Sequence, residues 1–151
     1  MLRVTVAAFV ASLAWFSPVY AESWVSAGRE NGKHVAINLE GVPDERAGPF
    51  RATLALIPAA WPANGHAYEL LIAEFDCTAR SRTVWTRIEY GGRHDPRRNV
   101  VSTPVAVTAA DSEAVALQLG IVCSQERSAT LPKYGWLDPL FRSLGLPHAS
   151  R

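Results

Sequence analysis

The sequence predicts an α+β fold in which an antiparallel sheet of about five to six strands packs against one C-terminal helix. Segments in which apolar and polar residues alternate follow one another over residues 24–107, with turn-forming residues between them. This alternation is typical of half-buried antiparallel strands. One segment of helical composition, residues 112–122, comes after the strands. In this order of elements the helix covers the apolar face of the sheet, because both have an apolar side that must be buried.

The first two strands are predicted to form a hairpin. An extended segment opens at Trp24 and is followed by the dipeptide Asn31-Gly32. Asn-Gly between two segments of strand character is the strongest short-range signal for a hairpin turn. Residues 35–39 then alternate between apolar and more polar side chains, which predicts a strand with one buried face.

The middle of the chain is predicted to supply the remaining strands. Residues 50–58 alternate and end at a proline, residues 68–78 are the most apolar segment, and residues 82–90 precede two glycines. We expect residues 68–78 to form a central strand covered on both faces. Residues 100–107 are rich in valine but contain Pro104, so they are predicted to form an interrupted edge strand.

Alternation assigns the side chains of residues 82–90 to two faces. Val84 and Ile88 are expected on one face, and Trp85 and Arg87 on the opposite one.

The helix is predicted to begin after Asp111, a residue type favoured at the N-cap. Val115, Leu119 and Val122 are spaced to line one face of this helix. Cys123 comes directly after that face and marks the end of the helix.

The beginning of the chain, residues 1–21, is predicted to be a secretory signal peptide. Arg3 gives a positive start, an apolar segment follows over residues 4–16, and small residues precede a cleavage point after Ala21. The apolar segment is shorter than the ~20 residues that a membrane-spanning helix needs. We therefore expect an exported domain over residues 22–124, periplasmic or secreted, with no integral membrane segment once the signal is removed.

The chain has two cysteines, Cys77 and Cys123. Neither follows the predicted cleavage point directly, as the cysteine of a lipoprotein would, so no lipid anchor is expected. An even number of cysteines in an exported chain predicts a disulfide. A metal site is not expected, because zinc needs four ligands and no CxxC or histidine pair accompanies the cysteines. The disulfide would join the helix end to the central strand and stabilise the fold by about 4 kcal/mol.

Composition and motifs argue against several classes of function. The chain has 15 Lys and Arg against 14 Asp and Glu, so loss of Arg3 with the signal leaves 14 of each and a formally neutral protein. Net charge therefore gives no reason to expect nucleic-acid binding. No Gly-x-Ser-x-Gly, phosphate-loop, zinc-protease or dinucleotide-binding motif occurs. We expect a non-enzymatic protein without a cofactor.

Several of these segments occur in an order that is found in a known family. They are Trp24, the strands at residues 35–39, 68–75 and 82–90, Asp76-Cys77 with the following Arg80, and the helix that closes at Cys123. With these features the chain resembles the bacterial surface-adhesin protein E family over residues 24–124. The resemblance implies a curved, half-barrel-like antiparallel sheet with the helix against it, a disulfide between the two cysteines, and an adhesin-like role in the cell envelope. The chain lacks the lipid-anchor cysteine and a counterpart of the binding segment of the best-known member, so no binding residue is transferred.

Six arginines form a candidate binding patch. They fall within nineteen residues in which Glu89 and Asp95 are the only acids. Such a patch would attract an anionic partner, for example a sulfated glycan or an acidic protein face. The alternative is a solvated strand face whose charges are paired across the sheet. Since the stretch holds only two aromatic residues, we do not expect it to bind nucleic acid. The six are Arg80, Arg82, Arg87, Arg93, Arg97 and Arg98.

The C-terminal tail, residues 125–151, is apolar and lies outside the resemblance. A short helix is predicted after Asp138-Pro139. The tail is expected either to pack back on the domain or to dock on a partner chain or membrane surface. The candidate docking side chains are Trp136, Leu140, Phe141 and Leu144.

Two functions follow from these features. The first is an exported binding or accessory module of the bacterial cell envelope, with an unidentified protein or an anionic glycan as its partner. The second is a structural or assembly component of the envelope that docks through its tail.

Overall fold

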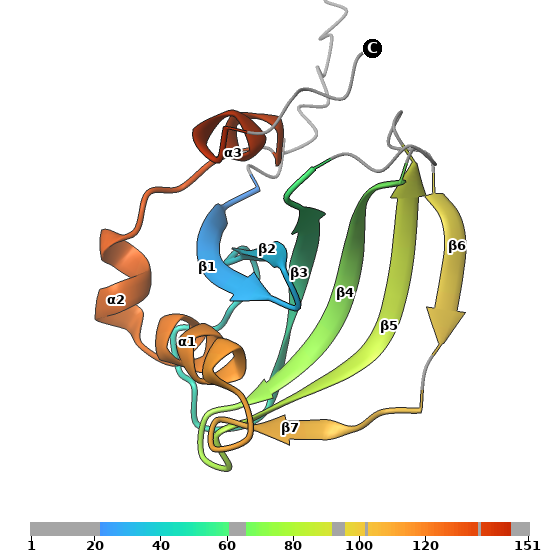
Figure 1. Ribbon diagram of the computed structural model, residues 1–151. Helices are drawn as coiled ribbons and strands as arrows, with labels where there is room; N and C mark the ends of the chain where they lie inside the picture. Colours follow the sequence, from blue (N-terminus) through green and yellow to red (C-terminus); the bar gives the residue numbers. More distant parts are fainter. Residues whose placement is uncertain (1–21, 61–65, 92–95, 102, 136, 146–151) are drawn as a thin grey trace, which may run out of the picture.

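The computed structural model describes residues 22–60, 66–91, 96–101, 103–135 and 137–145, which form a curved antiparallel sheet with helices against it. Figure 1 shows the half-barrel shape of the sheet, so the predicted fold class is confirmed. The strands are β1 (Trp24–Glu30), β2 (Lys33–Asn38), β3 (Phe50–Pro58), β4 (His66–Asp76), β5 (Ser81–Gly91), β6 (Pro96–Val101) and β7 (Ala106–Thr108), and the helices are α1 (Glu113–Val122), α2 (Gln125–Thr130) and α3 (Leu137–Ser143).

The strands lie in the sheet in the order in which they occur in the chain. The order is β1-β2-β3-β4-β5-β6, all neighbours are antiparallel, and β7 pairs with β5 beyond the end of β6. The predicted interrupted edge strand is therefore two short strands that both pair with β5. At the first hairpin Asn31 and Gly32 have φ values of 50° and 77°. Positive φ at both turn residues is what a tight two-residue hairpin requires, which explains the Asn-Gly dipeptide.

One face of the sheet packs against α1, and we call it the α1 face. Val25, Ile37, Leu54 and Phe75 on this face are fully buried against the apolar side of the helix. β1 approaches the helix so closely at Gly28 that an added Cβ would lie 2.5 Å from Leu117 Cδ2. Glycine is needed there for its size as well as for its positive φ of 83°.

The opposite face packs against α3, and we call it the α3 face. Trp24, Ile57 and Tyr68 on the sheet are buried against Leu140 and Phe141 of the helix. Backbone hydrogen bonds join Trp24 and Tyr134 in both directions, each of 2.9 Å, and hold the chain before α3 against β1.

β4 is central, as predicted, but it is not covered along its whole length on both faces. Leu71, Ala73 and Phe75 are buried on the α1 face, and Tyr68 is buried on the α3 face. Ile72, further along the α3 face, stays half-buried, because α3 packs on the other end of the strands.

The N-cap of α1 is Ser112 and not the predicted Asp111. The Ser112 hydroxyl accepts a hydrogen bond from the backbone N–H of Val115. The carboxylate of Asp111 instead accepts a 2.6 Å hydrogen bond from the Thr108 hydroxyl. Because its carboxylate is bonded to Thr108, Asp111 does not cap the helix.

The disulfide joins Cys77, directly after β4, to Cys123 at the C-terminal end of α1. The two Cα atoms are 5.6 Å apart and the residues are 46 positions apart in the chain. This bond confirms the predicted pairing, and it fixes the end of α1 to the central strand.

Candidate functional site

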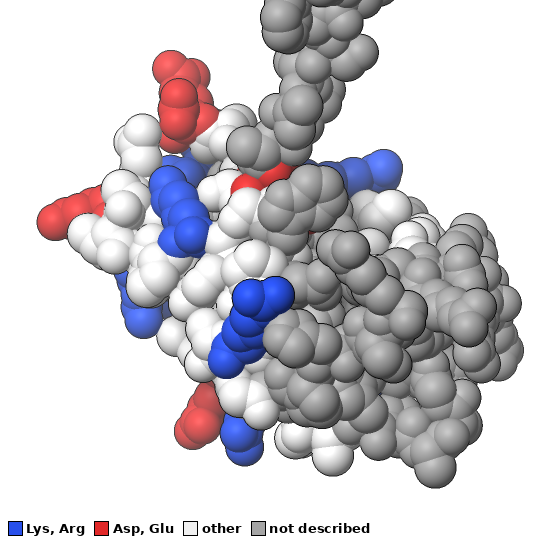
Figure 2. Space-filling view, turned by 90° about the horizontal axis from the view of Figure 1, so that it is seen from above, with Lys and Arg blue, Asp and Glu red and all other residues white. Residues whose placement is uncertain are grey.

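Of the six arginines of the predicted patch, the three whose side chains the structure describes do not form one exposed surface. Arg80 is exposed in the turn between β4 and β5, with a positive φ of 51°. Arg82 is buried, and Arg87 is exposed on β5. Arg93 lies outside the described residues, as do the side chains of Arg97 and Arg98 on β6. Where charged residues are visible in Figure 2, both signs are interspersed, with no patch of a single sign on the part of that face which the structure describes.

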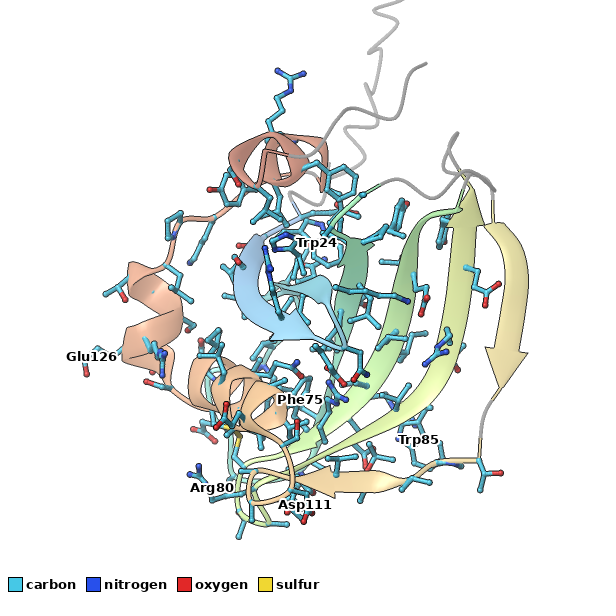
Figure 3. All side chains as sticks on the ribbon, in the orientation of Figure 1. Trp24, Phe75, Arg80, Trp85, Asp111 and Glu126 are labelled. Atoms are coloured by element: carbon cyan, nitrogen blue, oxygen red, sulfur yellow. A yellow bond between two sulfur atoms is a disulfide. The ribbon has the colours of Figure 1, made fainter. Side chains whose placement is uncertain are left out.

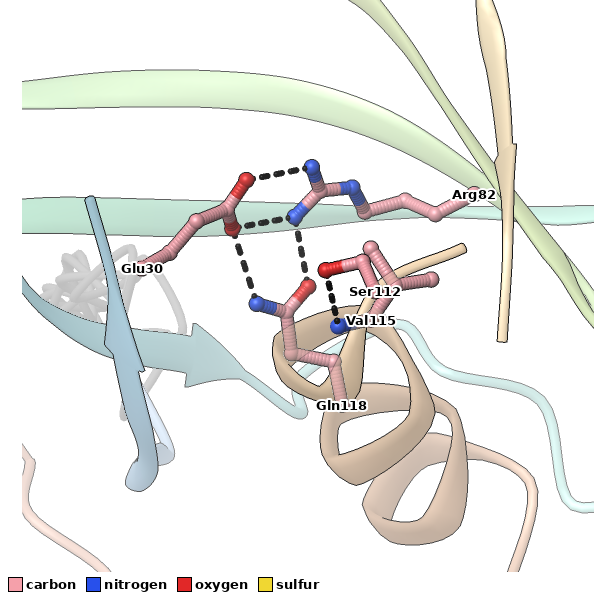
Figure 4. A network of polar contacts seen from close by, with 5 residues as sticks. All are labelled: Glu30, Arg82, Ser112, Val115 and Gln118. Atoms are coloured by element: carbon pink, nitrogen blue, oxygen red, sulfur yellow. Dashed lines mark hydrogen bonds and ion pairs between the residues drawn. The ribbon is translucent and has the colours of Figure 1, made fainter. Parts of the chain in front are cut away.

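Arg82 belongs to a buried ion-pair network that also contains Glu30 and Gln118 (Figure 4). Its two terminal nitrogens donate to the two carboxylate oxygens of Glu30 at 2.7 and 2.8 Å. Nη1 also donates to Gln118 Oε1 at 2.6 Å, and Gln118 Nε2 donates to Glu30 Oε2 at 3.0 Å. These three side chains link β5, β1 and α1. The prediction that Arg82 forms part of a binding patch is wrong, because its guanidinium is buried and donates its hydrogen bonds to Glu30 and Gln118.

The network also fixes the ionisation of Glu30. The hydrogen bond from Arg82 lowers the pKa of this carboxyl, and the hydrogen bond from Gln118 and the charges of Arg82 and Arg87 act in the same direction. Burial opposes them by disfavouring the charged form. Glu30 is thus held as a carboxylate, which is the form that a buried arginine needs as its partner.

A second group of charges lies on the α1 face, and we call it the charged row: Lys33 of β2, Glu69 of β4 and Arg87 of β5. The register pairs Glu69 with Leu56 and Arg87 with Leu71, two buried residues of this face. Lys33 forms an ion pair with Glu69 Oε1, and Arg87 Nε lies 3.4 Å from Glu69 Oε2.

The cations of the charged row are its outermost groups. The side chains of Lys33 and Arg87 are 35% and 47% exposed, whereas that of Glu69 is 18% exposed. Glu69 Oε2 is buried and accepts no hydrogen bond from the described residues, so Arg87 contacts it through charge alone. Glu89, directly opposite Glu69 in the register, is half-buried.

This arrangement is suited to binding an anionic group. An ammonium has three N–H donors and a guanidinium has five, and one carboxylate uses few of them. Ion pairs that are open to solvent contribute only about 0.2–1 kcal/mol, so an incoming carboxylate or sulfate can share the two cations at small cost.

The part of the predicted tail that forms α3 packs on the domain. Leu140 and Phe141 are fully buried, Leu144 is half-buried, and the Phe141 ring lies 6.0 Å from that of Tyr68. Trp136 lies outside the described residues. Because Leu140 and Phe141 fill the space between α3 and the sheet, they are not available to a partner as the docking prediction required.

Sequence reasoning found Arg87 but missed Lys33 and Glu69. Glu69 could have been found, because an acid inside the most apolar predicted strand must have a partner when it is buried. Lys33 follows the hairpin turn, and nothing in its local sequence distinguishes it from an ordinary surface lysine.

Comparisons with protein-family models, with curated proteins and with solved structures found no match for this chain. Within the part of the chain that the structure describes, no cluster of His, Cys, Asp and Glu could hold a metal ion. None of the described helices is long and apolar enough to cross a membrane.

Proposed function

We propose that the protein is an exported, non-enzymatic binding module of the bacterial cell envelope that binds an anionic group through the charged row. The observation that supports this function is the order of charges on the α1 face, where Lys33 and Arg87 lie outside and Glu69 lies beneath them. A carboxylate or sulfate that approaches this face meets two cations with unused hydrogen-bond donors before it meets the acid.

Export is supported by the disulfide and by the predicted signal peptide. A disulfide between Cys77 and Cys123 is stable in the oxidising compartments outside the cytoplasm. The curved sheet with its helix and disulfide also agrees with what the resemblance to the surface-adhesin protein E family implies. The alternative, an assembly component that docks through its tail, is less well supported, because Leu140 and Phe141 are buried in the fold.

The test is binding of the full chain, recovered after expression with its own leader, to three immobilised polysaccharides. Heparin presents sulfates, polygalacturonate presents carboxylates, and dextran is uncharged. We expect salt-sensitive binding to one or both of the anionic polymers. The variant Lys33→Ala/Arg87→Ala should bind at least about tenfold more weakly, which is the loss expected when roughly 1.4 kcal/mol of charge-assisted contact is removed.

The matched control is Arg80→Ala, which removes an exposed arginine that lies in the turn after β4 and outside the charged row. This variant is expected to bind like the wild type. If the double variant also binds like the wild type, or if Arg80→Ala weakens binding equally, the charged row is not the site.

A further inference from the structure

Trp85 is a large aromatic residue that remains exposed on a sheet whose other aromatic side chains are mostly buried or half-buried. Its exposed fraction is 37%, and Val105 is the other exposed large hydrophobic among the described residues. Figure 3 shows Trp85 on β5 near β7, away from α1 and α3. Part of the indole is covered by its neighbours, and the part that stays open is available for contact with a ligand.

A β-bulge places Trp85 on this surface. Ile72 pairs with Thr86 and Ala73 pairs with Val84, so the register passes over Trp85 as an extra residue. The contact of its ring with Arg51, which pairs with Glu74 in the register, places it on the α3 face. Bulges of this kind redirect a side chain at the cost of a local break in pairing, and they recur next to binding sites.

Two charged residues hold the ring, and with it they form what we call the Trp85 surface: Trp85, Arg51 and Glu74. The Arg51 guanidinium carbon lies 5.5 Å from the centre of the ring, within cation–π distance. Arg51 Nε lies 3.9 Å from Glu74 Oε2. The three residues come from β5, β3 and β4, so this part of the sheet supports the ring across neighbouring strands.

Three threonines lie on the same face of the sheet as the Trp85 surface. Thr53 and Thr86 flank Ile72 in the register, and Thr83 lies opposite Glu74. Direct partners share a face of the sheet, so all three threonines lie on the α3 face. Hydroxyl groups are therefore available on the same face as the ring, beside the apolar side chain of Ile72.

We infer that the Trp85 surface binds a saccharide ring. A pyranose has one face of C–H groups and a rim of hydroxyls. The C–H face can stack on the exposed part of an aromatic ring, while the rim hydroxyls donate to Glu74 and accept from Arg51 and the threonines. This site lies on the opposite face of the sheet from the charged row and does not depend on the function proposed for that row.

The test is isothermal titration of the full chain with three uncharged tetrasaccharides: β-1,4-linked N-acetylglucosamine, β-1,4-linked glucose and α-1,4-linked glucose. At least one should bind. Trp85→Ala should weaken binding by about tenfold or more, a loss on the order of one aromatic stacking contact. Trp85→Phe, which keeps a smaller ring, should weaken it less, and Arg51→Ala should weaken it while the ring remains.

The control is Lys33→Ala/Arg87→Ala, which should bind the saccharide like the wild type and so separates this site from the charged row. The unfolding midpoint of each variant is measured beside its binding, so that loss of saccharide binding is separated from loss of the folded state. The inference fails if the wild type binds none of the tetrasaccharides, or if Trp85→Ala binds one of them as tightly as the wild type does. Capture of a protein through Trp85 without saccharide binding would also overturn it.

Discussion

Arg82 and Arg87 lie on the same strand and the same face, yet their surroundings give them different roles. Arg82 is 5% exposed and donates to two partners inside the fold, whereas Arg87 is 47% exposed and contacts a single carboxylate. A buried guanidinium that lost its carboxylate would be an uncompensated charge. An exposed one keeps water as a partner, so Arg87 can be exchanged at little cost to the fold.

Glu30→Gln is expected to destabilise the protein by about 3 kcal/mol, because it leaves the buried charge of Arg82 without a carboxylate. Urea unfolding near neutral pH measures this change. Glu69→Gln is the matched control, since its partners Lys33 and Arg87 are partly solvated, and it should cost less than about 1 kcal/mol. Equal effects of the two substitutions would contradict a structural role for the buried network.

The same carboxyl predicts how stability depends on pH. The pKa of Glu30 is lower in the folded state than its ordinary value of 4.5, so the unfolded chain takes up the proton first as the pH falls. The stabilisation is complete above that ordinary value and is lost as the pH falls through the lower folded pKa. Burial also lowers the pKa of His34, but this histidine is present in both the wild type and Glu30→Gln and does not contribute to the difference between them. The difference in stability between wild type and Glu30→Gln should therefore shrink on acidification from pH 5 to 3.

The sequence could not show which arginines share a face, because alternation assumes an unbroken strand. Without a bulge, Arg82 and Arg87 would lie on opposite faces, as would Val84 and Trp85. The extra residue at Trp85 shifts the alternation, so Arg82, Val84 and Arg87 all lie on the α1 face. Trp85 lies on the other face, with Ile88. A one-residue shift of this kind leaves no mark in composition.

At the scale of elements, local signals predicted the hairpin of β1 and β2, the apolar β4 and the position of α1. They did not predict which surface α3 packs against. Its apolar residues were visible, but whether they meet the sheet or a partner depends on Trp24 and Ile57, which are far away in the chain. Packing between segments far apart in the chain depends on the three-dimensional fit of their side chains, which a single sequence does not show.

Phe141→Ala tests the docking of α3. The ring is fully buried against Tyr68, so its removal should lower the free energy of unfolding by about 3 kcal/mol or more. Arg142→Ala changes the next residue of the same helix, which is exposed, and should stay within about 0.5 kcal/mol. If both variants unfold like the wild type, α3 does not pack on the sheet in solution.

At the scale of the whole molecule, the disulfide leads to a prediction about where the protein is found. We expect the protein recovered from cells to begin at Glu22, to be found outside the cytoplasm, and to gain the mass of two hydrogen atoms on reduction. Cell fractionation followed by intact mass measurement with and without reductant checks all three points. A full-length, reduced chain in the cytoplasm would contradict the export on which the proposed function depends.

The contact between Trp24 and Tyr134 sets the order in which the two layers of the molecule can form. β1 lies near the beginning of the described chain, and the segment that covers its α3 face lies near the end. Hairpins between neighbouring strands can form as soon as their residues are available, since every strand from β1 to β6 pairs with the next. The α3 layer, in contrast, forms only when almost the whole described chain is present, so a chain that ends before Tyr134 leaves Trp24 without this cover.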